Sequence, residues 1–219
     1  QMVCAEHELR EEFPREVEEL AEKFPEQVSA EEMAERVDRR DLPFVTIDPI
    51  DAKDFDDAIC AESLPEGRFR LGVAIADVSH FVSQGDPIDQ EALLRGTSVY
   101  IPGKTIPMLP ERLSNGLCSL RPHEDRLAKV VWMELDAKGQ FLDIQLEKAV
   151  IHSAHRFTYE DAQATIDGAA PESVGQDLQE QIILLNQLRQ VLLNRRLRQG
   201  SLQLDIEEMK LVLDDEGEG

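Results

Sequence analysis

Five aspartates fall within ten positions of one short segment and mark the part of this chain best suited to chemistry: Asp48, Asp51, Asp54, Asp56 and Asp57. Carboxylates this close together repel one another and raise one another's pKa unless a cation neutralises them. Their hard oxygen atoms suit Mg²⁺ or Mn²⁺. We therefore interpret the segment as a divalent-cation site, and the alternative is a solvated acidic turn.

The sequence around the aspartates favours the metal interpretation. Apolar residues at 44–47 and 58–61 are typical of buried strands, beside which an unpaired carboxylate is costly. Pro49 interrupts any helix or central strand, so Asp48 and the group at 54–57 can converge from two sides of one loop. A helix-loop-helix calcium site is disfavoured because its turn glycine and closing glutamate are missing at the required offsets.

The segment DLPFVTIDPIDAKDFDDAICAE resembles the opening of the catalytic (RNB) domain of the ribonuclease II/ribonuclease R family. The likeness continues in family order through LGVAIADVSHFV, RGTSVYIPGKTIPMLPERLSNGLCSLRP and HSAHRFTYEDA, and it covers roughly residues 41 to 215. It is closer to the ribonuclease R branch. The resemblance implies a metal-dependent, hydrolytic 3′-to-5′ exoribonuclease that degrades single-stranded RNA to nucleoside 5′-monophosphates.

The resemblance also assigns residues. The four acidic residues of the family active site match Asp48, Asp54, Asp56 and Asp57, with Mg²⁺ as the expected ion and Mn²⁺ as a possible substitute. Paired divalent ions activate water and stabilise the leaving oxygen in phosphodiester hydrolysis. Asp48 and Asp57 are the expected direct ligands. Asp54 and Asp56 would share the second ion or orient the water, and Asp51, without a family counterpart, is interpreted as solvated.

Tyr100 matches the family tyrosine that stacks near the 3′ end of RNA, and ordinary packing of a strand aromatic is the alternative. Ribonuclease II-like members place a second clamping phenylalanine where this chain has Leu204. His80 is interpreted as structural. His152 and His155, three residues apart, could ligate a metal on a helix, but their segment is expected to be a strand end, so no zinc site is assigned. Trp132 is interpreted as a core residue.

The net charge of −22 opposes RNA binding by bulk electrostatics. The balance reverses locally, which predicts a positive groove from five cations: Arg95, Lys104, Arg112, Arg121 and Arg126. The three separated cysteines indicate neither a disulfide framework nor a zinc site. Without an apolar run of about 18 residues, no membrane segment is expected. We expect a cytoplasmic protein.

The hydrophobic pattern predicts an α+β (mixed α/β) domain. Helices are expected near 14–24, 29–37, 86–95 and 176–199, with a short one after Thr158, and strands at 42–47, 58–62, 69–76, 98–101, 127–136 and 141–152. This gives a sheet of about six strands, several of them antiparallel. The resemblance implies a curved, largely antiparallel sheet with flanking helices, incomplete at its C-terminus.

We expect residues 1–40 to form a helical lead-in and residues 41–219 to be the N-terminal portion of the catalytic domain. Family members carry adjoining RNA-binding barrels and the rest of the catalytic domain, including an "SPIRRY"-like segment whose arginine assists catalysis and a further glutamate. Neither is present in these 219 residues. The alternative is therefore a noncatalytic RNB-like module that binds RNA or a protein. The complete set of aspartates favours the enzyme.

Overall fold

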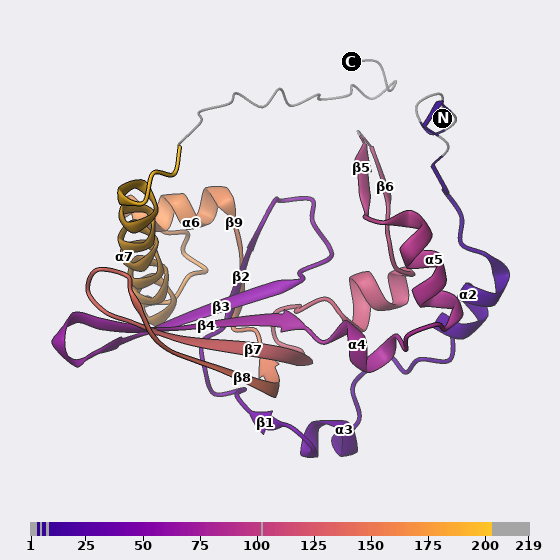
Figure 1. Ribbon diagram of the computed structural model, residues 1–219, viewed down its shortest axis with the longest axis horizontal. Coiled ribbons are helices and arrows are strands. Elements are labelled where there is room, and N and C mark those ends of the chain that lie inside the picture. The colour runs from indigo at the N-terminus through magenta and orange to yellow at the C-terminus, as the bar shows by residue number, and fades with distance from the viewer. Residues whose placement is uncertain (1–3, 5, 8, 102, 203–219) are drawn as a thin grey trace.

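The computed structural model describes residues 4, 6–7, 9–101 and 103–202. Within them, seven strands form one sheet in the order β1-β8-β7-β4-β3-β2-β9 (Figure 1). Their bounds are β1 (Val37–Asp38), β2 (Val45–Asp48), β3 (Asp57–Leu64), β4 (Arg68–Ala76), β7 (Asp125–Leu135), β8 (Phe141–His152) and β9 (His155–Thr158). A separate hairpin pairs β5 (Val99–Ile101) with β6 (Lys104–Ile106).

Helices flank this frame on both sides. They are α2 (Arg15–Ala21), α3 (Ala30–Ala34), α4 (Val78–Phe81), α5 (Pro87–Arg95), α6 (Tyr159–Ile166) and α7 (Gln176–Arg198), with a 3-10 turn at Pro65–Gly67 and a π-type turn at Leu113–Leu117. None of the described helices is long and apolar enough to cross a membrane. The expected α+β class with a largely antiparallel sheet is confirmed.

Antiparallel pairing joins β2, β3, β4, β7 and β8, and short parallel pairs add β1 and β9 at the two edges. The long β7–β8 hairpin is closed by Asp136, whose Oδ1 accepts the backbone N–H groups of Lys138 and Gln140 at 2.8 Å. Gly139 takes the positive φ of 79° that this turn needs. The predicted hairpin therefore forms at the predicted place.

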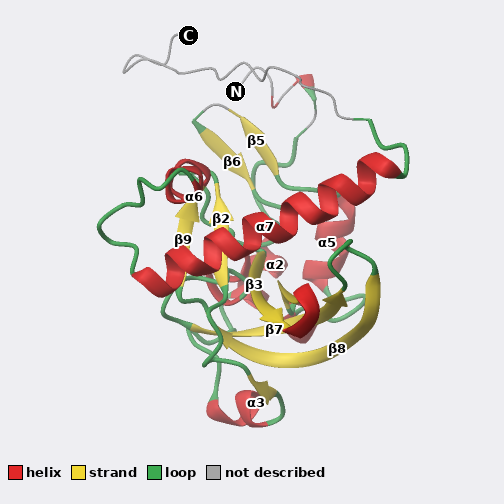
Figure 2. Ribbon diagram, turned by 90° about the vertical axis from the view of Figure 1, so that its left-hand side faces the viewer, coloured by secondary structure: helices red, strands yellow, loops and turns green. Residues whose placement is uncertain are grey.

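The sheet buries a separate apolar cluster on each face. Ala58, Ala74 and Val130 face the cluster that also contains Val17 of α2 and Ile88 of α5. The opposite face packs against α6 and α7, and Figure 2 shows α7 lying across that side of the sheet. Alternation along the strands places neighbouring residues in different clusters, as a sheet covered on both faces requires.

Gly72 in β4 allows the closest approach in this core. A Cβ atom built at Gly72 would lie 2.6 Å from the Trp132 ring and 3.0 Å from the Cys60 sulfur atom. Trp132 is buried, as predicted, and its indole N–H donates to Glu147 Oε1 at 2.7 Å. The aromatic ring therefore occupies the space that a side chain at position 72 would take.

The lead-in is tied to the sheet by a buried ion pair. Arg36 and Asp77, whose side chains are 4% and 1% exposed, lie 2.8 Å apart. Burial raises the pKa of Asp77, but Arg36, Ser79 and Lys129 outweigh it and leave that pKa below its usual value. The lead-in also contributes Val17, Ala21 and Val28 to the core. The boundary at residue 40 stays a prediction.

Candidate active site

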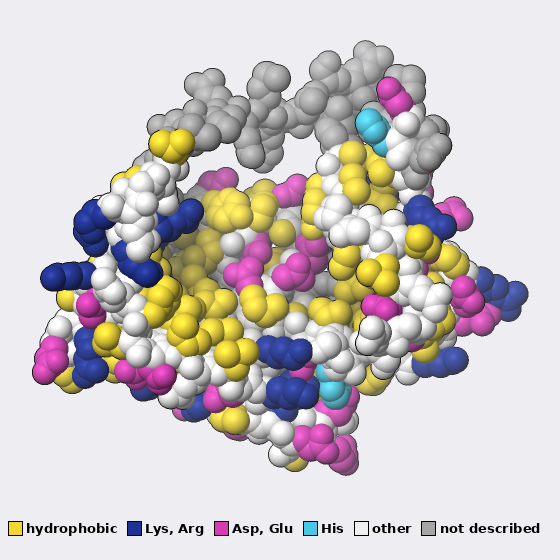
Figure 3. Space-filling model, in the orientation of Figure 1, with side chains coloured by type: hydrophobic (Ala, Val, Ile, Leu, Met, Phe, Trp, Pro, Cys, Tyr) yellow, Lys and Arg dark blue, Asp and Glu magenta, His cyan; other side chains and the backbone are white. Residues whose placement is uncertain are grey.

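The predicted acidic segment is a loop between two paired strands. β2 ends at Asp48 and β3 begins at Asp57, and the antiparallel β2–β3 pair brings these two ends together. The intervening residues carry Asp51, Asp54 and Asp56. Figure 3 shows acidic side chains gathered in a central hollow near the ends of these strands, with apolar side chains around them.

Ser119 holds this loop in place. Its fully buried hydroxyl donates to the Lys53 carbonyl at 2.8 Å and accepts the Phe55 N–H at 3.1 Å. The next residue, Leu120, donates its N–H to the Phe55 carbonyl at 2.8 Å. Asp54 therefore lies on a segment whose backbone is fixed on both sides. Sequence reasoning missed Ser119, although it lies in the quoted GLCSLRP motif.

Two further contacts extend this support. Ala76 at the end of β4 donates its N–H to the Asp56 carbonyl at 2.9 Å. The buried Arg126 side chain donates Nε to the Ser119 carbonyl at 2.9 Å and so fixes the turn that carries the serine. A preorganised site requires supporting hydrogen bonds of this kind, which hold the loop that carries its side chains.

Burial and mutual repulsion raise the pKa of two carboxyl groups at this site. Crowding by protein atoms raises the pKa of Asp56 to about 6, and the charges of Asp54, Asp57 and Asp48 add to the shift, although part of the residue remains exposed to solvent. Burial also raises the pKa of Asp48, with a further contribution from Asp57. Both shifts show that negative charge at this site lacks full compensation from the protein.

Asp48 supplies a direct sign of a missing partner. Its Oδ2 atom is buried and accepts no well-formed hydrogen bond among the described residues, although the nearby Thr46 hydroxyl partly opposes the rise in the Asp48 pKa. A buried, unpaired carboxylate oxygen is costly, and a hard divalent cation would satisfy it. In the described residues, no three His, Cys, Asp or Glu side chains already converge to hold an ion. Carboxylate oxygens are the ligands that Mg²⁺ and Mn²⁺ prefer, so the donor chemistry of these residues fits either ion.

Arg156 is a cation at the site that no local sequence pattern indicated. It lies on β9, whose parallel pairing sets Arg156 opposite Thr46 of β2. The guanidinium donates to the Pro49 carbonyl, and its carbon lies 5.5 Å from the centre of the Phe55 ring. Its charge partly opposes the rise in the Asp48 pKa, and its buried Nε has no described partner.

Tyr100 faces the loop from the β5–β6 hairpin. Its side chain is 62% exposed, so it is not packed in a core, and its hydroxyl donates to Asp54 Oδ2. Burial of the hydroxyl and the adjacent Asp54 raise the pKa of Tyr100 to about 12. A cleft of about 420 Å³ lies between loop and hairpin and is lined in part by Lys53, Asp54, Tyr100, Lys104 and Asn115.

The predicted positive groove is wrong. Arg95 and Arg126 are buried, and Arg95 pairs with Glu91 at 3.0 Å. The other three cations are also engaged within the fold: Lys104 pairs with Glu11, Arg112 donates to the Phe24 carbonyl, and Arg121 lies 3.4 Å from Glu124. Figure 3 shows lysine and arginine side chains in separate groups at the left, bottom and right of the view, and acidic side chains in the central hollow. Counting charges along the sequence could not reveal the partners of Lys104 and Arg112, which come from the distant N-terminal part of the chain.

The three histidines singled out in the sequence make protein contacts. His80 Nε2 lies 2.6 Å from Glu32 Oε1, and His152 Nδ1 lies 2.8 Å from Asp125 Oδ1. The His155 ring packs against Phe157 with 4.5 Å between centroids. Leu204, the position compared with a clamping phenylalanine, lies outside the described residues.

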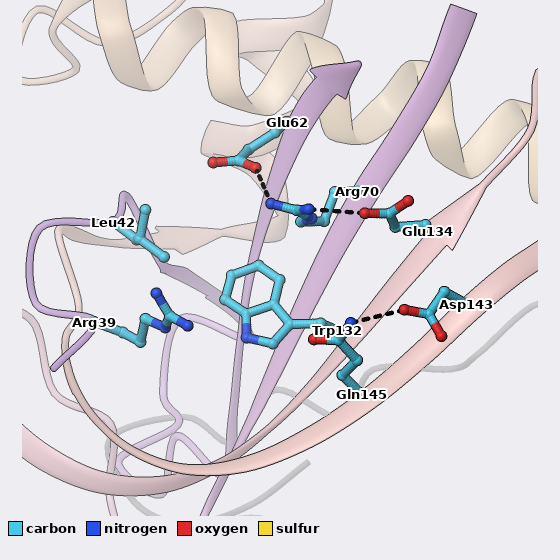
Figure 4. Close-up of a pocket in the computed structure, with 8 residues that line it drawn as sticks. All are labelled: Arg39, Leu42, Glu62, Arg70, Trp132, Glu134, Asp143 and Gln145. Carbon is cyan, nitrogen blue, oxygen red and sulfur yellow. Dashed lines mark hydrogen bonds and ion pairs between the residues drawn. The ribbon is translucent and has the colours of Figure 1, made fainter. Parts of the chain in front are cut away.

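A second hollow, of about 160 Å³, lies at the far end of the sheet and is lined by Leu42, Trp132 and polar side chains (Figure 4). Arg70 bridges Glu134 at 2.7 Å and Glu62 at 3.4 Å, and Arg39 pairs with Glu147 at 2.8 Å. These mutually satisfied ion pairs span neighbouring strands. We therefore assign this hollow a structural role and place the chemistry at the acidic loop.

Comparison with known proteins gives a consistent result. The model of the RNB domain family matches residues 36–219. The chain is 41% identical over 217 residues to ribonuclease R 1 of Lactococcus lactis, covering 98% of this chain and 26% of that protein. It therefore spans about a quarter of the length of this relative.

Two solved structures share the fold. One is Mycoplasma genitalium RNase R in complex with ribose-methylated single-stranded RNA, with a TM-score of 0.91, 33% identity, and coverage of 98% of this chain and 33% of that chain. The other is the same protein in complex with double-stranded RNA, with a TM-score of 0.92, 33% identity, and coverage of 98% and 38%.

Proposed function

Because this chain belongs to the RNB domain family, we propose that it carries the acidic half of the active site of a 3′-to-5′ exoribonuclease. The proposed reaction is hydrolysis of single-stranded RNA to nucleoside 5′-monophosphates with Mg²⁺, for which Mn²⁺ can substitute. The observation that carries the proposal is the buried, unpartnered Asp48 oxygen beside three further aspartates. The related structures with bound RNA support the substrate class.

The aspartates would hold the ions and position the reacting groups. Asp48 and Asp57 would be direct ligands, and Asp54 and Asp56 would complete the second position or orient the attacking water. Divalent ions bound there would supply a nucleophile at neutral pH and stabilise the leaving 3′-oxygen. Asp56, with a pKa of about 6, carries a proton part of the time near neutral pH, so binding of a cation would displace that proton.

Tyr100 would hold the end of the substrate. Its exposed ring borders the cleft beside the loop, and its hydroxyl is fixed by Asp54. Stacking of a base on an aromatic ring contributes about 1–3 kcal/mol and tolerates every base. A nuclease that removes successive nucleotides from any sequence needs this kind of contact. Arg156 would hold the Asp48 end of the loop through the Pro49 carbonyl.

A noncatalytic RNB-like module that binds RNA or a protein is the second candidate. It is favoured by the absence, within the described residues, of three acidic or histidine side chains that already converge on an ion. The two functions differ in what they require of the aspartates. Only the enzyme needs Asp56 for turnover, whereas a binding module would tolerate its neutralisation.

The test uses the full-length protein encoded by the gene, with a 3′-labelled single-stranded RNA and Mg²⁺. Wild-type protein should release nucleoside 5′-monophosphates without added phosphate, and Asp56→Asn should abolish turnover while RNA affinity is retained. Asp51→Asn is the matched control, because it removes a carboxylate from the same loop and should keep activity. Phosphate-dependent release of nucleoside diphosphates, or normal turnover by Asp56→Asn, would contradict the proposal.

A further inference from the structure

The tip of the β7–β8 hairpin and the end of α7 form a cavity of about 460 Å³ lined by Lys138, Gln140, Arg195, Arg198 and Gln199. All five side chains can donate hydrogen bonds, and none is a carboxylate. The two elements come from distant parts of the chain and are joined by Arg198, which donates to the Lys138 carbonyl at 3.3 Å. This cavity is separate from the acidic loop, whose residues do not line it.

Gly139 lets the turn of the β7–β8 hairpin lie close to α7. A Cβ atom at Gly139 would lie 3.1 Å from a methyl carbon of Val191 in α7 and 3.6 Å from Cδ of Arg195. Only a glycine with positive φ lets the turn lie this near the helix. Arg195 is held in turn by Phe141, with its guanidinium carbon 4.9 Å from the ring centre. The position of this arginine is therefore fixed by the fold.

Arg195 has an unused donor at this site. Its Nε atom is buried and has no hydrogen-bond partner among the described residues. Asp136, the acidic residue of the same turn, points its Oδ1 at the backbone N–H groups of Lys138 and Gln140. In the part of the chain that the structure describes, neither Lys138 nor Arg198 forms an ion pair with a carboxylate, in contrast to Lys104 and Arg126.

Cations in the last turn of a helix also stabilise the helix by interacting with its dipole. That effect accounts for charge near the end of α7 but not for Lys138 and Gln140, which come from the hairpin, or for the buried unpartnered donor. A cavity surrounded by guanidinium, ammonium and amide donors fits an oxyanion with several acceptor oxygens. A phosphate is such a group.

We propose that this cavity, termed the hairpin–helix site, binds a backbone phosphate of RNA at a distance from the acidic loop. The identification of RNA as the source of the phosphate rests on the proposed function. The hairpin–helix site would provide this strongly acidic chain with a local positive surface for RNA. It would replace the positive groove that was predicted between Arg95 and Arg126.

The test measures RNA affinity of the full chain in EDTA, where hydrolysis is suppressed, as a function of salt. Lys138→Ala combined with Arg198→Ala removes two exposed charges from the site. Loss of one phosphate contact lowers the slope of log affinity against log salt by about 0.7 and weakens binding about eightfold at about 0.05 M salt. The matched control is Lys23→Ala combined with Lys148→Ala, which removes two exposed charges elsewhere.

The expected result is a smaller slope and weaker binding in the site variant alone, with an unchanged melting temperature. Equal slopes in the site variant and wild type, equal losses in site and control variants, or no RNA binding by wild type would each overturn the inference. A parallel titration with adenosine 5′-monophosphate separates the sources of phosphate: tighter binding of this nucleotide than of RNA, lost in the site variant, would refute a backbone site.

These outcomes are independent of the proposed chemistry. Asp56→Asn should keep the wild-type slope because it leaves the hairpin–helix site intact. If wild type binds RNA through this site but the full-length protein never cleaves RNA, the proposed function fails and the inference stands. If the full-length protein cleaves RNA and the slope is unaffected by the site variant, the inference fails and the proposed function stands.

Discussion

Removing the Ser119 hydroxyl should loosen the acidic loop and lower the stability of the protein together. The hydroxyl is fully buried and serves two backbone groups, the Lys53 carbonyl and the Phe55 N–H. A buried polar group left without a partner costs about 1–3 kcal/mol. With two such groups and some relaxation, Ser119→Ala should lower the free energy of unfolding by about 2–3 kcal/mol.

Ser153→Ala is the matched control, because Ser153 is equally buried but its hydroxyl makes one weak contact, 3.4 Å from the His155 carbonyl. Its loss should stay below about 1 kcal/mol. Urea unfolding in EDTA measures both variants, and calorimetry with Mn²⁺ measures the site. Ser119→Ala should also weaken Mn²⁺ binding, because Asp54 and Asp56 lie on the released segment. Equal stability losses in the two variants with unchanged Mn²⁺ binding would refute the reasoning.

Four further predictions concern particular residues. Burial and neighbouring charges raise the folded-state pKa of Asp56 to about 6 from an ordinary value of 3.8, so its contribution to stability is present below pH 3.8 and is lost as pH rises through 6. Unfolding in EDTA should therefore show that Asp56→Asn is more stable than wild type at pH 7 but not at pH 3.5. Equal differences at the two pH values would contradict this. Tyr100→Phe should keep most of the affinity for the RNA 3′ end because the ring remains, whereas Tyr100→Ala should lose about 1–3 kcal/mol, measured by competition binding; equal losses would exclude stacking. Gly72→Ala should lower the free energy of unfolding by about 1–3 kcal/mol, because the new methyl would overlap the Trp132 ring, and an unchanged urea midpoint would contradict this packing. Arg36→Ala should cost about 3–5 kcal/mol because it leaves the buried Asp77 without its main partner, whereas Arg15→Ala, which breaks an exposed pair, should change urea unfolding little.

The sequence was informative where local pattern controls structure. Alternating apolar residues predicted the long hairpin of β7 and β8, and the Asp86-Pro87 pair with Gly96 predicted α5 within a residue. The short strands β1, β6 and β9 were missed because two to four residues carry too little periodicity. The first two helices are shorter than predicted, ending at Ala21 and Ala34.

The aspartates of the candidate site could be predicted from the sequence, but the residues that hold their loop in place could not. The aspartates stand together in the sequence, so their spacing alone indicated the loop. Ser119 and Arg156 reach it from distant segments through the fold, and no local pattern connects them to it. The charge reversal between Arg95 and Arg126 misled because its cations are engaged within the fold. Arg95 and Arg126 pair with acids close by in the sequence, whereas Lys104 pairs with Glu11 of a distant segment.

The parallel pairing of β2 with β9 has a consequence for the growing polypeptide. Val45 lies opposite His155, so the two strands are about 110 residues apart along the chain. At a synthesis rate of about 5–20 residues per second, β2 emerges from the ribosome about 5–20 s before its neighbour exists. During that interval its outer edge is unpaired, a template for improper association, and Asp48 lacks Arg156. A pause in translation between these strands would lengthen that vulnerable period, whereas a chaperone bound to β2 would protect it until the acidic loop can be completed.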